Sequence, residues 1–80
     1  MSLEKDLREE IRKWTAKLDD AFSAIGAIDG RGRKMLSNIE AYRKDSKHFL
    51  ERGDLIKSFE CLIWAWALLE VGKELGHLGV

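Results

Sequence analysis

The chain has 80 residues, which is enough for one domain and too short for two. Its 14 basic and 14 acidic side chains cancel, so the total charge does not favour long-range attraction to nucleic acid or to an anionic membrane. The single cysteine, Cys61, excludes a disulfide within the chain and suits a reducing cytosol, so we expect a cytoplasmic location.

The composition predicts helices that each have one apolar and one charged face. Charged residues make up 35% of the chain and hydrophobic residues 45%, which favours segregated faces over disorder. No proline is present, so glycine provides the strong breaks between helices. The longest apolar run, Cys61 to Leu69, has nine residues, whereas a helix that spans a bilayer needs about 20. We therefore expect no membrane partner.

The first predicted helix covers residues 2–26. Ser2 is a good N-cap, and Glu4 follows it near the positive end of the helix dipole. Apolar residues then recur in steps of three and four along one stripe, which consists of Leu3, Leu7, Ile11, Trp14, Leu18, Ala21, Phe22 and Ile25. Three glycines and Asp29 between residues 26 and 32 predict a turn.

The second predicted helix covers residues 31–52 and the third covers residues 54–77. Gly53 suits the left-handed conformation that stops a helix, and Asp54 suits the N-cap of the next one. So short a connection makes these two helices antiparallel neighbours. We therefore expect an all-α fold, an antiparallel up-down-up three-helix bundle, with residues 1–80 as a single domain.

The third predicted helix carries more apolar residues than a peripheral helix needs. At about 100° per residue, one stripe contains Phe59, Leu62, Ile63, Trp66 and Leu69. A nearly opposite stripe, spaced like a coiled-coil seam, contains Cys61, Trp64, Leu68, Val71, Leu75 and Leu78. One stripe is enough to meet two neighbours in a bundle, so the second stripe is a candidate interface.

Three arrangements would account for the second stripe. In the first, the helix is central and the other two cover it. In the second, it packs against a second copy of the chain, as in a dimer. In the third, it meets a different protein or a fused domain outside this sequence. Trp64 distinguishes them, because a large aromatic side chain on an outer stripe is a typical interface anchor. Trp64→Ala leaves a monomer folded if the stripe is an interface, and unfolds it if Trp64 belongs to the core.

Two stretches of the chain resemble a known family. Residues 41–54 contain a tyrosine, an aromatic-Leu-Glu step and a closing Gly-Asp pair, and residues 59–72 continue with Phe-Glu and then Trp-Ala-Trp-Ala-Leu-Leu-Glu-Val-Gly. Together they resemble the two signatures of the archaeal domain-of-unknown-function family numbered 357. The chain has Trp66 where that family tends to have histidine, and Glu70 where it tends to have aspartate. The resemblance implies a small archaeal helical bundle and adds no activity, since the family's function is unassigned.

No catalytic, metal or nucleotide motif stands out, so we expect neither an enzyme nor a cofactor. Glu74 and His77 have the i, i+3 spacing of di-iron carboxylate bundles, but that chemistry needs two such pairs and two further glutamates. Nucleophilic catalysis by Cys61 needs an adjacent base and an oxyanion site, and neither histidine is recognisably placed.

Basic residues on the second predicted helix support an alternative function. Cations at the start of a helix oppose its dipole, so those at residues 31–34 have no local stabilising role. The candidate phosphate contacts are Arg31, Arg33, Lys34, Arg43 and Lys47, with acidic residues interleaved. The sequence thus predicts an interaction module that binds a second copy or another protein through its third helix. The alternative is a nucleic-acid-binding accessory domain.

Overall fold

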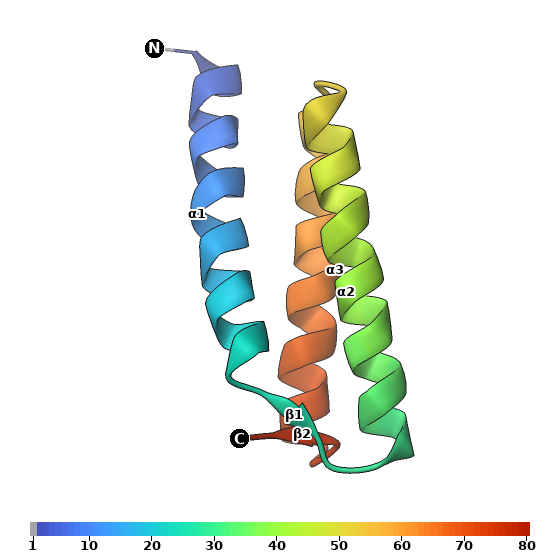
Figure 1. Ribbon diagram of the computed structural model, residues 1–80. Helices are drawn as coiled ribbons and strands as arrows, with labels where there is room; N and C mark the ends of the chain where they lie inside the picture. Colours follow the sequence, from blue (N-terminus) through green and yellow to red (C-terminus); the bar gives the residue numbers. More distant parts are fainter. Residues whose placement is uncertain (1) are drawn as a thin grey trace.

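Three long helices make up most of the computed structural model, which describes residues 2–80 (Figure 1). They are α1 (Leu3–Ser23), α2 (Gly30–Glu51) and α3 (Leu55–Glu74). Successive helices run in opposite directions, which confirms the predicted all-α, up-down-up three-helix bundle. The bundle is elongated, with extents of 44 × 18 × 17 Å. No helix within residues 2–80 is both long and apolar enough to cross a membrane.

Each helix begins at a short polar side chain that caps it. Ser2, Asp29 and Asp54 accept hydrogen bonds, at 3.0, 2.8 and 3.2 Å, from the backbone N–H three residues further on. These bonds satisfy N–H groups that have no partner inside the helix. Gly53, with a φ of 79°, ends the connection from α2 in the left-handed conformation. The caps predicted at Ser2 and Asp54 are confirmed.

α1 and α3 end earlier than their sequence patterns suggest. α1 stops at Ser23 rather than near residue 26, and α3 stops at Glu74 rather than near residue 77. The residues beyond them form two short strands, β1 (Gly26–Ala27) and β2 (Leu78–Gly79), which pair antiparallel. Gly76, with a φ of 79°, turns the chain out of α3. Hydrogen bonds between the strands then replace those that a longer helix would have made.

The end of the chain folds back onto the start of α2 and forms a contact that we call the clasp. In the clasp, Nδ1 of His77 donates a hydrogen bond of 2.7 Å to Oδ2 of Asp29, and the N–H of Ile28 donates to the His77 carbonyl at 2.9 Å. Gly32 lies so close to that carbonyl that an added Cβ would overlap it. The clasp therefore requires glycine at position 32.

The core runs along the buried side of α3. Its fully or nearly buried apolar residues are Ile11, Leu18, Ile39, Leu55, Leu62, Ala65, Leu69 and Leu78. Between α2 and α3, the hydroxyl of Ser58 donates to the Ser46 carbonyl at 2.8 Å and lies 3.1 Å from the Ser46 hydroxyl. These bonds satisfy two buried polar groups, and the small side chains allow the two helices to approach closely.

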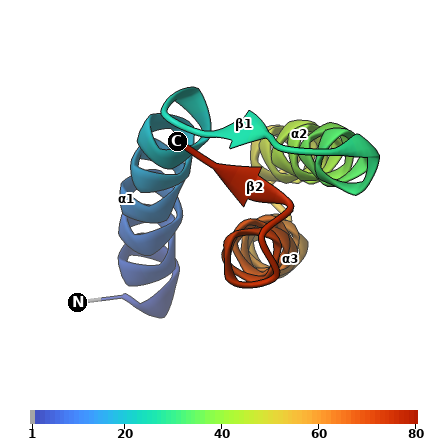
Figure 2. The same ribbon diagram turned by 90° about the horizontal axis from the view of Figure 1, so that it is seen from below.

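The three helices do not pack equally against one another. α3 packs against both α1 and α2, whereas α1 makes few contacts with α2. Figure 2, which looks nearly along α2 and α3, shows α1 at an angle to them. Trp66 of α3 donates from Nε1 to the Trp14 carbonyl of α1 at 3.3 Å, and the two rings pack edge to face with centroids 5.8 Å apart. α3 therefore holds the bundle together, and a groove remains between α1 and α2.

Candidate functional site

One side of α3 is apolar and is not covered by the rest of the chain. We call it the outer face; it consists of Ile56, Ile63, Trp64, Ala67, Val71 and Leu75. All six residues are exposed, and solvent reaches 52% of Ile63 and 58% of Trp64. Glu60, also exposed, separates Ile56 from Ile63 and Trp64 on this side of the helix. Large exposed apolar side chains gathered on one face of a monomer typically mark an interaction site.

The outer face exists because residues 61–69 are apolar all the way round the helix. A run that covers more than two turns directs side chains to every side of the helix axis. Leu62, Ala65 and Leu69 turn toward the other helices and are buried. α1 and α2 leave a third side of α3 open, and the remaining apolar side chains of the run lie there.

The predicted interface residues fall into three environments. Those on the outer face are Trp64, Val71 and Leu75, and those half-buried at the edge toward α2 are Cys61 and Leu68. Leu78 is 2% exposed and belongs to the core, so its assignment to an outer stripe is wrong. Because the helix ends at Glu74, helical spacing no longer describes the direction of a side chain at position 78.

The inner stripe predicted for α3 also needs correction at one residue. Ile63 was expected beside Leu62 on the covered side, yet it is half exposed, and Ile56 is exposed although neither stripe included it. Two small buried residues of α3 lie against α2: Ser58 bonds to Ser46, and a Cβ added to Gly72 would meet Met35. Ala65, seven residues from each, is also buried. This row of small residues shifts the covered side of α3 away from Ile63.

Trp64 is partly supported by the neighbouring helix. Its ring stacks on Tyr42 of α2, with centroids 6.3 Å apart and planes inclined by 17°. The two rings line a hollow of about 410 Å³ together with Asn38, Ala41, Asp45 and Leu68. Stacking restricts the indole while much of its surface stays open, which is the arrangement of a preformed interface anchor.

The surroundings of Cys61, three residues before Trp64 in α3, disfavour its thiolate form. Burial raises the pKa of its thiol, and the carboxylates of Asp45 and Glu60 raise it further. A thiol with a raised pKa stays protonated at neutral pH, whereas the thiolate is the nucleophile. Cys61 therefore acts as a small packing residue.

A second apolar hollow, of about 210 Å³, lies between α1 and α3. It is lined by Trp14, Phe59, Leu62, Ile63 and Trp66. Ile63 belongs both to this hollow and to the outer face, so the apolar surface continues from α3 to the edge of α1. Nζ of Lys17 lies 4.6 Å from the centroid of the Trp14 ring, in a cation–π contact that covers part of Trp14.

The structure does not bring the five predicted phosphate contacts together. Arg31, Arg33 and Lys34 lie in the first turns of α2, about 14–24 Å along the helix axis from Arg43 and Lys47 at 1.5 Å per residue. The latter two line the α1 side of α2. The candidate phosphate contacts therefore form two separate groups of cations on α2.

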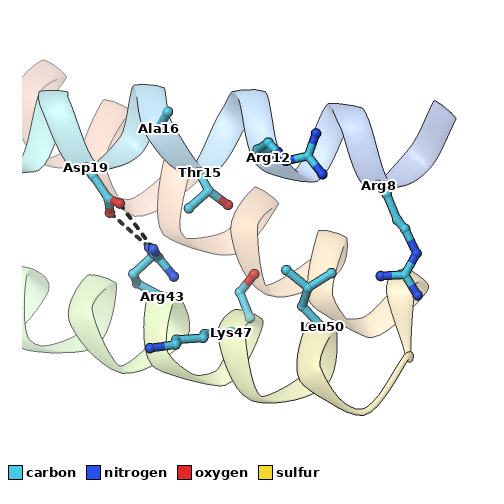
Figure 3. Close-up of a pocket in the computed structure, with 9 residues that line it drawn as sticks. Arg8, Arg12, Thr15, Ala16, Asp19, Arg43, Lys47 and Leu50 are labelled. Atoms are coloured by element: carbon cyan, nitrogen blue, oxygen red, sulfur yellow. Dashed lines mark hydrogen bonds and ion pairs between the residues drawn. The ribbon is translucent and has the colours of Figure 1, made fainter. Parts of the chain in front are cut away.

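Arg43 and Lys47 belong to a groove between α1 and α2, which we call the basic groove (Figure 3). Its volume is about 410 Å³, and it is lined by Arg8, Arg12, Thr15, Ala16, Asp19, Arg43, Ser46, Lys47 and Leu50. The carboxylate of Asp19 accepts two hydrogen bonds from Arg43, at 2.9 and 3.1 Å. Sequence reasoning missed Arg8 and Arg12. Their four-residue spacing places them on one side of α1, but only the fold shows that this side faces Arg43 and Lys47.

His77, which the sequence pairs with Glu74, bonds through Nδ1 to Asp29 in the clasp. No group of three or more histidine, cysteine or acidic side chains within residues 2–80 is arranged to hold a metal ion. The hydrogen bond from the Gly32 N–H holds the pKa of Asp29 below its ordinary value, and the bond from His77 lowers it further. The role of His77 in this structure is to tie the end of the chain to α2.

These features define a class of protein: a small three-helix bundle whose third helix leaves an apolar face open and whose first two helices enclose a basic groove. The chain belongs to the family described as "Protein of unknown function (DUF357)", whose sequence profile matches residues 6–78. The family predicted from the two signatures is therefore confirmed, and the match also includes most of α1.

A solved structure from an archaeon is similar over its whole length. It is the crystal structure of protein AF1782 from Archaeoglobus fulgidus, of the same family, with 46% sequence identity and a TM-score of 0.89. The match covers 98% of this chain and 97% of that chain. No match was found among curated proteins. The comparisons fix the family and the fold and assign no activity.

Proposed function

We propose that this chain is a self-association module that pairs with a second copy of itself through the outer face of α3. One observation carries the proposal: a helix that is essential to the bundle exposes Ile63 and Trp64 on the side that no other element covers. A protein that needed α3 only for its own core would require an apolar stripe on the covered side alone.

The size of the outer face supports a second copy as the occupant. Large apolar side chains that are half exposed present on the order of 100 Å² each, since burying a whole aromatic side chain removes about 150–250 Å². Five such residues on the outer face therefore present about 500 Å², near the upper end of the largest patch on a typical monomer, which covers about 300–600 Å². Two copies of the face would bury about 1,000 Å² if all of these side chains were covered, which is the lower limit for a specific interface.

The centre of the outer face suits close packing of two helices. Ala67 is the smallest residue on the face, and its neighbours at helical spacing are Ile63, Trp64, Val71 and the exposed Glu70. A small side chain bordered by large ones forms a hole that a large side chain from another helix can fill. In a symmetric pair, each chain supplies both the hole at Ala67 and the indole of Trp64.

Substitution of Ala67 tests the proposal with little effect on the fold. Ala67→Glu places a charge in the centre of the outer face, at an exposed position with a residue that favours helix. We expect sedimentation velocity to detect a concentration-dependent dimer for the original chain and a monomer for Ala67→Glu. The matched control is Ser37→Glu, which adds the same charge at an exposed position of α2 and leaves the dimer intact.

Two results would contradict this function. One is a monomer at all concentrations up to the millimolar range, which would show that a second copy does not cover the outer face. The other is an equal loss of association in Ala67→Glu and Ser37→Glu, which would show that net charge controls association. Circular dichroism of both variants establishes that the helices are retained.

A further inference from the structure

We propose that the basic groove between α1 and α2 binds a small ligand that carries two or more phosphate groups. This site lies on a different side of the bundle from the outer face, and it does not depend on self-association. Its evidence is the charge, the shape and the hydrogen-bonding capacity of the residues that line the groove.

The groove carries more positive charge than its ion pairs explain, because within residues 2–80 only Arg8 and Arg43 of its four cations form one. Arg8 and Arg12 on α1 and Arg43 and Lys47 on α2 line it, and Asp19 supplies the one carboxylate among its lining residues (Figure 3). Like charges on facing helices raise the free energy of the folded chain. A bound polyanion would remove this repulsion and bridge α1 to α2, which otherwise contact each other little.

Two of the four cations are available to a ligand. Arg43 is engaged by both oxygens of Asp19, and Arg8 lies 3.6 Å from Glu4 one turn earlier in α1. Within residues 2–80, neither Arg12 nor Lys47 forms an ion pair. Figure 3 also shows the hydroxyl of Thr15 between the two helices, where it can donate a further hydrogen bond. The free donors thus come from both walls of the groove.

The shape of the groove favours a small molecule over a polymer. Its volume of about 410 Å³ lies in the range of small-molecule sites, which is about 300–1,000 Å³. None of its lining residues is aromatic, whereas sites for single-stranded nucleic acid typically use aromatic side chains on which bases stack. Ala16 and Leu50 add apolar surface between the cations, which leaves room for a compact ligand body.

The spacing of the cations favours several phosphate groups. Residues four apart on a helix are separated by about 6 Å along its axis. Because α1 and α2 are antiparallel and Asp19 lies opposite Arg43, the cations Arg43, Lys47, Arg12 and Arg8 follow one another along the groove (Figure 3). The planar fork of arginine matches the geometry of phosphate oxygens and binds them through two hydrogen bonds. Inorganic oligophosphates and nucleoside triphosphates share this chemistry.

Titration calorimetry of the full chain at low salt, with sodium tripolyphosphate as the probe, tests the proposal. We expect saturable binding that Arg12→Gln and Lys47→Gln each weaken about tenfold or more, because each removes a charge-assisted hydrogen bond. Asp19→Asn is expected to tighten binding, because it removes the carboxylate and frees Arg43. Lys34→Gln is the matched control: it removes one positive charge at the far end of α2 and should change the affinity less than twofold.

The same titration with ATP distinguishes an inorganic oligophosphate from a nucleoside triphosphate as the ligand. Equal affinity for ATP and tripolyphosphate assigns recognition to the phosphates alone, and tighter binding of ATP assigns the site to a nucleotide; either result supports the proposal. Amide chemical shifts should then change between residues 8–19 and 43–50, on the facing sides of α1 and α2. The proposal is overturned by absence of binding to both probes, by an equal loss in Lys34→Gln, or by binding of an oligonucleotide that tripolyphosphate does not displace.

Discussion

The buried and exposed sides of α3 come from the same apolar run and have opposite environments. Leu62 and Leu69 are 1% exposed and pack in the core, whereas Ile63 and Trp64, adjacent to Leu62 in sequence, are more than half exposed. Burial of a large apolar side chain contributes about 1.5–3 kcal/mol. Burial of Leu62 and Leu69 therefore stabilises the folded single chain. Burial of the outer-face side chains would contribute a similar free energy only when a second copy covers them.

The largest expected effect is on the free energy of unfolding, which should distinguish the buried side of α3 from the outer face. Leu62→Ala should lower the free energy of unfolding by about 2–5 kcal/mol, because it opens a cavity in the core. Ile63→Ala should lower it by less than about 1 kcal/mol, because half of that side chain is already in water. Urea denaturation followed by circular dichroism, at concentrations where the chain is monomeric, measures both. Similar losses for the two variants would show that the outer face belongs to the core.

Trp64→Ala should weaken the dimer more than it destabilises the monomer, as expected for a residue of the outer face. We expect the dimer to weaken by about 2 kcal/mol or more, roughly 30-fold, since a central aromatic anchor is lost. The monomer should lose only about 0.5–1.5 kcal/mol, from the stacking with Tyr42. Ile28→Ala, at an exposed position outside α3, serves as the control and should leave the dimer unchanged. An unfolded Trp64→Ala monomer would place this residue among the core residues.

A pair of alanines tests the row of small residues that contacts α2. Ala65→Leu should destabilise the chain by about 1–3 kcal/mol, because the added atoms do not fit between two closely packed helices. Ala67→Leu, two residues further on, should change the free energy of unfolding of the monomer by less than about 0.5 kcal/mol. Thermal denaturation of both variants compares them directly. If Ala65→Leu is neutral, close packing at Ala65 is not required.

The smallest expected effect is on stability at low pH. It arises at the clasp, where His77, beyond the end of α3, bonds to Asp29. Because the pKa of Asp29 is lower in the folded chain than its ordinary value of 3.8, the ionised carboxylate stabilises the folded state above that pH. This contribution is lost as the pH falls through the folded pKa. Denaturation midpoints measured below about pH 5 should therefore fall less steeply for Asp29→Asn than for the original chain. Parallel curves would show that Asp29 does not contribute.

Much of the fold follows from the sequence because helix ends and helix stripes are local properties. Ser2, Gly53 and Asp54 mark caps and a stop by their own chemistry, and the three- and four-residue steps of apolar residues fix each helix. The strands β1 and β2 could not be predicted from the sequence, because each forms only by pairing with the other. Two residues pair only when distant parts of the chain meet, and nothing in either segment alone indicates that pairing.

The candidate site was harder to predict, since it depends on which side of α3 its neighbours approach. Large residues at helical spacing indicated two stripes, but the seven-residue spacing of Ser58, Ala65 and Gly72 was the pattern that located the contact with α2. The basic groove lay beyond sequence reasoning for a related reason. Arg12 and Lys47 are 35 positions apart, and only the packing of α1 and α2 on α3 brings them to the same groove.

Intermolecular nuclear Overhauser effects in a mixture of isotopically labelled and unlabelled chains test the central claim most directly. If the outer faces of two copies meet, methyl protons of Ile63 and Val71 in labelled chains should show contacts to the indole protons of Trp64 in unlabelled chains. Contacts from other surfaces, or none at millimolar concentration, would contradict the assignment of the outer face of α3 as the interface between two copies.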